Sequence, residues 1–217
     1  MTVFVKSWSA WSPGIETKEA WQAFARGEVE LQDSPLQPEL PFAPAMFKRR
    51  LSQLSRMAIQ TGYEVLGKSA QIKITFASVY GEIAQQLHIA LKLIETHQVS
   101  PAAFSLSVFN TPVAALSILS KNKAGYTAIF PGETAFRDGL IETVSTIKSG
   151  SDEERILIYA DEYIPEEYRK ITTAKTMPFA LAIRLSKNRE GDAIELSDDI
   201  NSYASPLEFI KKCLLKK

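Results

Sequence analysis

The pattern of apolar and polar residues at the start of the chain predicts a β-strand followed by a long connection. Residues 2–11 are rich in Val, Phe and Trp, and the run stops at a Ser-Pro-Gly turn. Residues 18–25 are compatible with a short helix. The four prolines in residues 35–44 then predict a mostly irregular segment, because proline cannot donate a backbone hydrogen bond.

The next apolar residues recur at helical spacing. Phe47, Leu51, Leu54 and Ala58 fall on one helix face, with basic residues beside them. This spacing predicts one continuous helix that starts after Pro44.

The rest of the chain alternates between strand and helix patterns. Predicted strands cover residues 71–77, 126–130, 155–160, 179–185 and 193–196, and predicted helices cover residues 81–97, 113–119, 134–148 and 207–215. The last two strands are expected to form a hairpin. Strands that alternate with helices predict an α/β fold with a mixed, mostly parallel sheet and helices on both faces.

Composition limits the class of protein. The chain has 217 residues, no net formal charge and 45% hydrophobic residues, which indicates a single domain over residues 1–217 with its own core. Because it has no basic stripe, it is not expected to bind nucleic acid. No apolar run reaches the ~20 residues that span a bilayer, and the N-terminus lacks a signal-peptide pattern, so we expect a cytoplasmic protein.

Candidate metal and cofactor residues are few. The single cysteine, Cys213, excludes an internal disulfide and a CxxC metal site. His88 and His97 do not have the i, i+4 spacing of a metal-binding helix. The sequence also lacks a nucleotide-binding glycine motif and a GxSxG elbow, so neither a cofactor nor a metal is expected.

Two acidic pairs follow one of the predicted strands. Asp161-Glu162 and Glu166-Glu167 have the residue type needed for acid–base chemistry. Pro165 separates them, and acidic runs are usually solvated, so a solvent-exposed loop is the expected structure.

Three segments of the chain resemble β-ketoacyl synthases. They are FASVYGE (residues 76–82), SPAAFSLSVFN (residues 100–110) and GETAFRDGL (residues 132–140). The order of elements around them is similar to the part of that family that leads to the reactive cysteine. The narrower resemblance is to short, chain-length-factor-like ketosynthase proteins of aryl polyene-type biosynthesis. It implies half of a thiolase-like fold.

The resemblance puts an acidic residue where the family has its nucleophile. Counted without gaps from Asn110, the position of the reactive cysteine falls on Glu133. A carboxylate cannot hold an acyl thioester. The two histidines of a ketosynthase's C-terminal half also have no counterpart in the sequence, so the resemblance implies no condensing activity for this chain alone. Glu133 also has a purely structural interpretation, because the helix dipole favours an acidic residue in a first turn.

The resemblance also implies where a partner subunit binds. In the family, the segment before the elbow reaches across a dimer interface, and the partner closes the acyl tunnel. The residues implied for interface and tunnel are Ala103, Phe104, Val108, Phe109, Asn110, Tyr126, Ile129 and Phe130. Phe109 stands where the family usually has histidine, so no polar role is carried over to it.

Three functions remain open from the sequence. The leading hypothesis is a non-catalytic subunit that forms a heterodimer with a full-length ketosynthase, meets acyl carrier protein through that complex, and shapes the acyl tunnel. The second is a stand-alone acyl-handling enzyme in which Glu133 or Asp161 acts as a base. The third is a degenerate scaffold that only stabilises a partner.

Overall fold

A six-stranded mixed sheet forms the centre of the molecule. The computed structural model describes residues 2–67, 71–130, 132–172, 176–197, 199–203 and 205–215. The described strands are β1 (Phe4–Trp11), β2 (Lys73–Ala77), β3 (Tyr126–Ile129), β4 (Glu154–Asp161), β5 (Phe179–Ser186) and β6 (Ile194–Glu195). Their order in the sheet is β3-β2-β4-β5-β1-β6.

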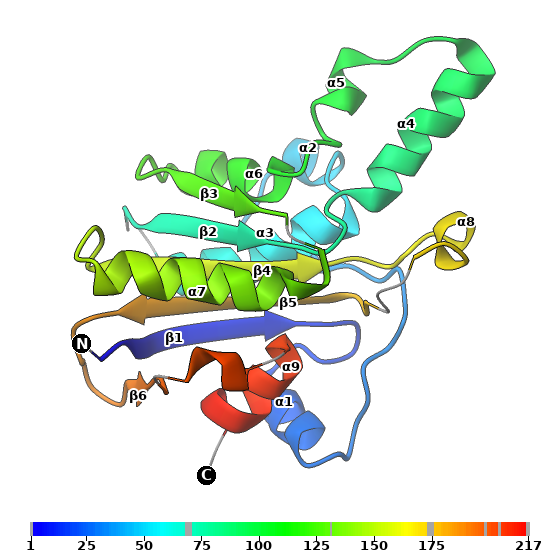
Figure 1. Cartoon of the computed structure of the whole chain (residues 1–217). Helices are drawn as coiled ribbons and strands as arrows, with labels where there is room; N and C mark the ends of the chain where they lie inside the picture. The colour runs from blue at the N-terminus through cyan, green and yellow to red at the C-terminus, as the bar shows by residue number, and fades with distance from the viewer. Residues whose placement is uncertain are drawn as a thin grey trace.

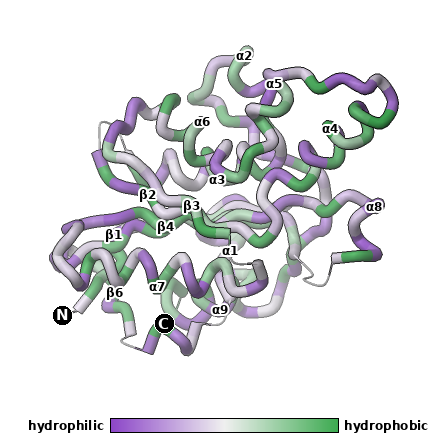
Figure 2. Tube along the Cα trace, turned by 45° about the horizontal axis from the view of Figure 1, so that its top comes forward, coloured by the Kyte–Doolittle hydropathy of each residue, from purple (hydrophilic) through white to green (hydrophobic). Residues whose placement is uncertain are grey.

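Helices cover both faces of this sheet, as predicted (Figure 1; Figure 2). The described helices are α1 (Lys18–Ala25), α2 (Ala45–Lys48), α3 (Gln53–Leu66), α4 (Ile83–Thr96), α5 (Pro101–Phe104), α6 (Thr111–Ser120), α7 (Ala135–Lys148), α8 (Glu166–Arg169) and α9 (Pro206–Phe209), with short turns at Gly132–Thr134, Ile200–Ser202 and Ile210–Leu214. On one face, α3 and α6 contribute Leu54 and Leu116 to a buried apolar cluster. On the other face, α7 and α9 contribute Leu140 and Phe209 to a second cluster.

The sheet is less parallel than predicted. β2 is parallel to β3 and β4, but the pairs β4–β5, β5–β1 and β1–β6 are all antiparallel. A parallel neighbour needs a long crossover, usually a helix that packs on the sheet. Between β4 and β5 the described residues form only the four-residue α8, so β5 returns antiparallel to β4.

The predicted hairpin of the last two strands is wrong. β6 pairs with β1, with Val5 opposite Ile194, and β1 lies between β5 and β6. The first strand occupies the free edge of β5 along its whole length, from Phe4 opposite Ser186 to Trp11 opposite Ala180. Because β1 already pairs with β5, β6 pairs with the other edge of β1 and not with β5.

The single helix predicted after Pro44 is two helices. α2 ends at Lys48, and α3 begins only after Ser52, whose hydroxyl accepts a hydrogen bond from the N–H of Ser55 at 2.9 Å. Serine is a strong N-cap, so it starts a new helix where the apolar spacing alone suggested continuity. α3 then packs closely on its neighbours, because a Cβ added at Gly62 would lie 2.5 Å from Cδ2 of Leu116.

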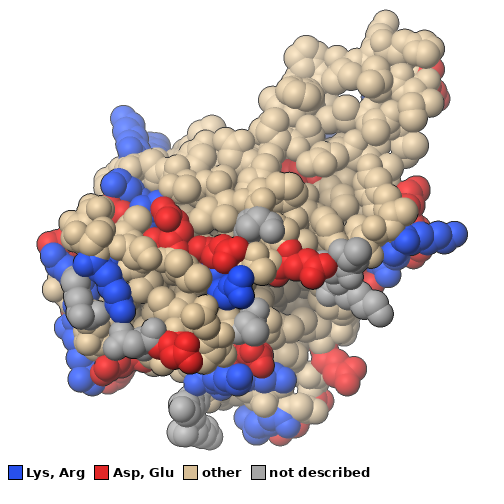
Figure 3. Space-filling model, viewed as in Figure 1, with Lys and Arg blue, Asp and Glu red and all other residues tan. Residues whose placement is uncertain are grey.

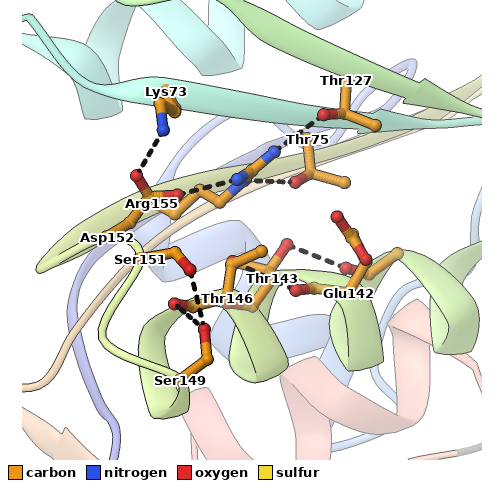
Figure 4. A network of polar contacts seen from close by, with 11 residues as sticks. Lys73, Thr75, Thr127, Glu142, Thr143, Thr146, Ser149, Ser151, Asp152 and Arg155 are labelled. Carbon is orange, nitrogen blue, oxygen red and sulfur yellow. Dashed lines mark hydrogen bonds and ion pairs between the residues drawn. The ribbon is translucent and has the colours of Figure 1, made fainter.

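A buried arginine links three strands (Figure 4). Arg155 of β4 forms an ion pair with Asp152 at 2.8 Å and donates hydrogen bonds to the hydroxyls of Thr75 in β2 and Thr127 in β3, also at 2.8 Å. Lys73 pairs with the other oxygen of Asp152. Burial alone would raise the pKa of Asp152, but the bonds from Lys73 and Arg155 outweigh burial and lower it. The guanidinium therefore connects the edge strand to the centre of the sheet.

One helical segment projects from the body. α4 and α5 extend beyond the end of the sheet, as Figure 1 shows, and we call residues 83–104 the arm. Ile83, the first residue of α4, is the only buried residue of that helix. In the described part of the chain, no helix has the length and apolar character needed to cross a membrane.

Candidate functional site

Glu133 lies in the turn that joins β3 to α7. The order of strand, short turn and long helix is the one predicted for this segment. The Glu133 side chain is exposed and borders a cavity of about 230 Å³, which is also lined by Phe136 and Tyr159. Burial, followed by the charge of Asp161, raises the pKa of Tyr159 well above its ordinary value, so the phenol is neutral at pH 7.

The described residues that line this cavity include a carboxylate and a phenol but no thiol or imidazole. Cys213 is buried in the C-terminal turn beside Tyr203. His88 is exposed on α4, and His97 caps the C-terminal end of that helix. The described surroundings of Glu133 therefore contain no group that forms a thioester.

The structure brings the two predicted interface segments together. Phe109 lies between Phe76 and Phe130, with ring centroids 5.5 and 4.7 Å away. The amide of Asn110 donates a hydrogen bond to the hydroxyl of Tyr126 at 2.9 Å. The run that ends at Asn110 and the strand β3 therefore form one surface, which we call the β3 surface.

The FASVYGE segment packs against the Phe109 side chain of this surface. Gly81 has a φ of 61°, a conformation that favours glycine, and a Cβ at this position would lie 2.6 Å from Cδ2 of Phe109. Glycine is needed both for the turn and for the close approach of the ring.

Several predicted residues of the β3 surface expose apolar side chains. Phe104 is 57% exposed and Phe130 is 61% exposed. Exposed aromatic side chains are typical of a surface that a partner covers. Of the other predicted residues, Val108 and Tyr126 are exposed, and Ala103, Phe109, Asn110 and Ile129 are half-buried.

The strand β3 is at the edge of the sheet. It pairs in parallel with β2, from Tyr126 opposite Ile74 to Ile129 opposite Ala77. On its other side no strand is found among the described residues. An unpaired edge presents backbone donors and acceptors that another chain can pair with.

A larger cavity of about 710 Å³ adjoins the β3 surface. It is lined by Pro44, Met46, Phe47, Arg50, Leu51, Ser105, Leu106, Val108, Asn110, Thr111, Ala114, Ala115 and Ile118. Of these only Val108 and Asn110 were predicted; the contribution of α2 was missed because α2 and α3 were expected to be continuous. The sequence of α6 did carry a signal, since it is apolar on nearly all sides, which is typical of a helix covered on all sides.

Charged side chains are scarce on this side of the molecule. In Figure 3, Lys, Arg, Asp and Glu atoms gather around α7 and the C-terminal turns, whereas few lie over β3 and the arm. Among the described residues that line the 710 Å³ cavity, Arg50 is the one charged side chain. Depletion of charge together with exposed aromatic residues is characteristic of the centre of a protein interface.

The predicted solvent-exposed acidic loop is wrong for Asp161 and Glu162. Both are buried, because Asp161 is the last residue of β4 and backbone N–H groups take the place of water around both carboxylates. Glu166 and Glu167 are exposed, but they lie in α8 rather than in a loop. A third carboxylate, Glu82, is also buried, which the sequence did not predict. No group of three His, Cys, Asp or Glu side chains in the described residues has an arrangement that could hold a metal ion.

Comparisons with known proteins agree with this fold. A family model described as "Beta-ketoacyl synthase, N-terminal domain" matches residues 20–209. A chain in the structure of the ketosynthase ApeO in complex with its chain length factor ApeC, from Xenorhabdus doucetiae, is 27% identical with a TM-score of 0.77, over 87% of this chain and 80% of that chain. No curated protein sequence matches the chain.

Two more distant structures share the fold alone. The ishigamide ketosynthase/chain length factor is 13% identical with a TM-score of 0.68, and the match covers 90% of this chain but only 65% of that chain. The AntDE ketosynthase, solved with the type II acyl-carrier protein AntF, is 14% identical with a TM-score of 0.71, over 93% of this chain and 70% of that chain.

Proposed function

Since the chain belongs to the family of β-ketoacyl synthase N-terminal domains, we propose that it is a non-catalytic, chain-length-factor-like subunit of a ketosynthase. The observation that carries this proposal is Glu133 at the turn between β3 and α7. The resemblance puts the family's cysteine at this position, and a carboxylate there cannot carry the acyl group.

The proposed partner is a full-length β-ketoacyl synthase, which binds the β3 surface. The unpaired edge of β3 offers main-chain hydrogen bonds to a partner strand, and the exposed Phe130, directly after β3, offers apolar area beside it. Supporting evidence comes from the complex of ApeO with its chain length factor ApeC, the 27% identical structure. Acyl carrier protein then binds the heterodimer through its ketosynthase subunit. In the AntDE structure, the acyl-carrier protein AntF is likewise in complex with its ketosynthase.

The proposed task of this chain in the pair is to shape the acyl tunnel. The 710 Å³ cavity and the ring of Phe109 lie beside the β3 surface, and the cavity lining is mostly apolar. A growing aryl polyene or fatty acyl chain is apolar and gains free energy when it leaves water for such a lining. The side chains at Val108 and Phe109 then limit how far the chain can extend.

The test is co-expression of the tagged chain with the full-length ketosynthase encoded beside it, followed by light scattering. A stable 1:1 complex is expected. Phe130→Asp, which puts a charge into the β3 surface, should weaken the complex at least about tenfold, since a buried unpaired charge costs several kcal/mol. Ile171→Asp is the matched control, because Ile171 is also an exposed apolar residue but lies after α8.

The outcomes separate the alternatives. If the chain stays monomeric and does not bind the ketosynthase, the proposal is excluded. Thioester hydrolysis or transfer by the chain alone, abolished by Glu133→Gln, would establish the stand-alone enzyme instead. A 1:1 complex whose product length is unchanged by Val108→Phe and Phe109→Ala would reduce the chain to a scaffold.

A further inference from the structure

Three carboxylates are buried where β2 and β4 end. Asp161 closes β4, Glu162 follows it, and Glu82 directly precedes α4. Their exposed fractions are 1%, 3% and 0%. Carboxylates are rarely buried unless hydrogen bonds or cations compensate for the lost hydration, so the partners of each group decide its charge.

Asp161 is bound by the loop that follows β2. Its Oδ1 accepts hydrogen bonds from the hydroxyl of Ser78 at 2.8 Å and from the N–H groups of Val79 and Tyr80 at 2.9 and 3.3 Å. Burial raises the pKa of Asp161 to about 6, against the hydrogen bonds from Tyr159 and from this loop, which lower it. Asp161 is therefore mostly ionised at pH 7.

Glu162 joins the starts of two helices. Its Oε2 accepts a hydrogen bond from the N–H of Leu54 in the first turn of α3 at 3.3 Å, and its Oε1 accepts one from the N–H of Ala84 in the first turn of α4 at 3.0 Å. First-turn N–H groups have no acceptor within their own helix. The carboxyl group of Glu162 is therefore a direct link between the body and the root of the arm.

Glu82 is buried at the same root of the arm and its charge acts on Glu162, so we call Glu82 and Glu162 the carboxyl pair. Its Oε1 accepts a hydrogen bond from the hydroxyl of Ser55 at 2.5 Å, whereas its Oε2, fully buried, has no hydrogen-bond partner among the described residues. Burial, and after it the charge of Glu82, raises the pKa of Glu162 to about 8. Burial raises the pKa of Glu82 to about 7, although the hydroxyls of Ser52 and Ser55 oppose it.

Within the described residues, no cation acts on the carboxyl pair. Arg56 of α3 donates to backbone carbonyl groups, and Arg169 of α8 pairs with Asp33 and Glu166. The remaining charged group that acts on the pair is Asp161, which adds a third negative charge. With no counter-ion, a bound proton is what relieves the repulsion between the two carboxyl groups.

We propose that a proton held by Glu82 or Glu162 fastens the arm to the body, and that loss of this proton loosens the root of the arm. The proton passes to water, and no covalent bond changes. The proposal goes beyond the proposed function and does not require a partner subunit.

The structure shows why ionisation would act on the arm. Glu82 directly precedes Ile83, which is the only buried residue of α4. A displacement of Glu82 therefore moves the start of that helix. A cavity of about 430 Å³, lined by Glu162, Ala84 and Gln85 among others, lies at the same place. Water in this cavity can hydrate the carboxylates once they separate.

The test is amide hydrogen exchange of the full chain between about pH 6 and about pH 8.5, corrected for intrinsic exchange rates. The amides of Leu54 and Ala84 report on the link directly, because both donate to Glu162. Their protection is expected to fall at least about tenfold over this range, with a midpoint in the range of the two raised pKa values. Glu82→Gln, which removes one of the two ionisable groups, should make this loss of protection smaller.

Glu95→Gln is the matched control, because Glu95 is an exposed acid on the same helix and its substitution should leave the pH response unchanged. Constant protection of Leu54 and Ala84 in the unmodified chain would overturn the proposal, and this result does not depend on any variant folding. An equal loss of protection at Ile158 in the centre of β4 would also overturn it, because it would indicate global rather than local opening.

Discussion

Replacement of Arg155 by methionine tests the idea that one buried guanidinium stabilises the sheet out to its edge strand. Methionine keeps an unbranched apolar stem and removes the charge and all its donors. The Arg155 side chain is 6% exposed, and it makes three contacts of 2.8 Å, to Asp152, Thr75 and Thr127. No other side-chain bond between β4 and β3 is found among the described residues.

The expected loss is about 3 kcal/mol of unfolding free energy. Breaking a buried ion pair by removing one partner costs about 3–5 kcal/mol, because the other charge stays buried. The low end applies here, since Asp152 keeps its ion pair with Lys73 at 2.8 Å. The measurement is urea unfolding at neutral pH followed by tryptophan fluorescence.

Arg137→Met is the matched control for Arg155→Met. The Arg137 side chain is 41% exposed, and its contact with Asp138 is 3.5 Å long, so its loss should cost less than about 0.5 kcal/mol. A second readout is local: the amide of Thr127 should exchange faster in Arg155→Met, because β3 then loses its side-chain hydrogen bond to β4. If Arg155→Met is no less stable than Arg137→Met, the arginine is not a structural link.

Three further outcomes are expected. The unfolding free energy should fall as the pH rises from about 4.5 to about 7, because the raised pKa of Glu82 means that the folded state binds more protons than the unfolded state; the difference of about 2.5 units between 7 and 4.5 corresponds to roughly 3 kcal/mol, and Glu82→Gln should reduce this slope in urea titrations, while the raised pKa values of Asp161 and Glu162 preserve part of it. Gly62→Ala should destabilise the chain by about 1–3 kcal/mol in thermal unfolding despite the better helix propensity of alanine, because its Cβ would lie 2.5 Å from Leu116, and an unchanged Tm would show that the contact relaxes. Ser52→Ala should cost about 1 kcal/mol in the same assay through the lost N-cap of α3, and Ser52→Thr should restore most of it.

Local patterns in the sequence predicted most elements, because helix and strand periodicity depend on neighbouring residues. Residues 18–25 form α1 as predicted, and the strand, turn and helix around Glu133 follow the predicted order. The break before α3 was missed because the apolar spacing runs across it, although Ser52 is a recognisable cap. The partner of β6 could not be predicted in this way, since it depends on which strand already occupies the edge of β5.

The acidic residues illustrate the limit more sharply. Asp161 and Glu162 belong to an acidic run interrupted by Pro165, and such runs are usually solvated, which favours an exposed loop. Their burial depends on N–H groups far away along the chain: Leu54 is 108 residues from Glu162, and Val79 is 82 residues from Asp161. No local pattern encodes such donors. The burial of these carboxylates therefore follows only from the tertiary structure, in which β2, β4 and the starts of two helices come together.

Arg155 and Glu162 are buried polar side chains that stabilise two outward-facing elements, the edge strand β3 and the arm. Arg155 links the edge strand β3 to the sheet, and Glu162 links the arm to the body. Both elements expose apolar side chains, Phe130 after β3 and Phe104 at the end of the arm. An exposed element that is fixed in the free chain loses less conformational entropy when a partner covers it, which leaves more of the contact energy for binding. On the proposed function, Arg155 and Glu162 therefore favour association without touching the partner, and substitution of either residue should lower affinity mainly through slower association, because the free surface is then less often in the conformation that binds.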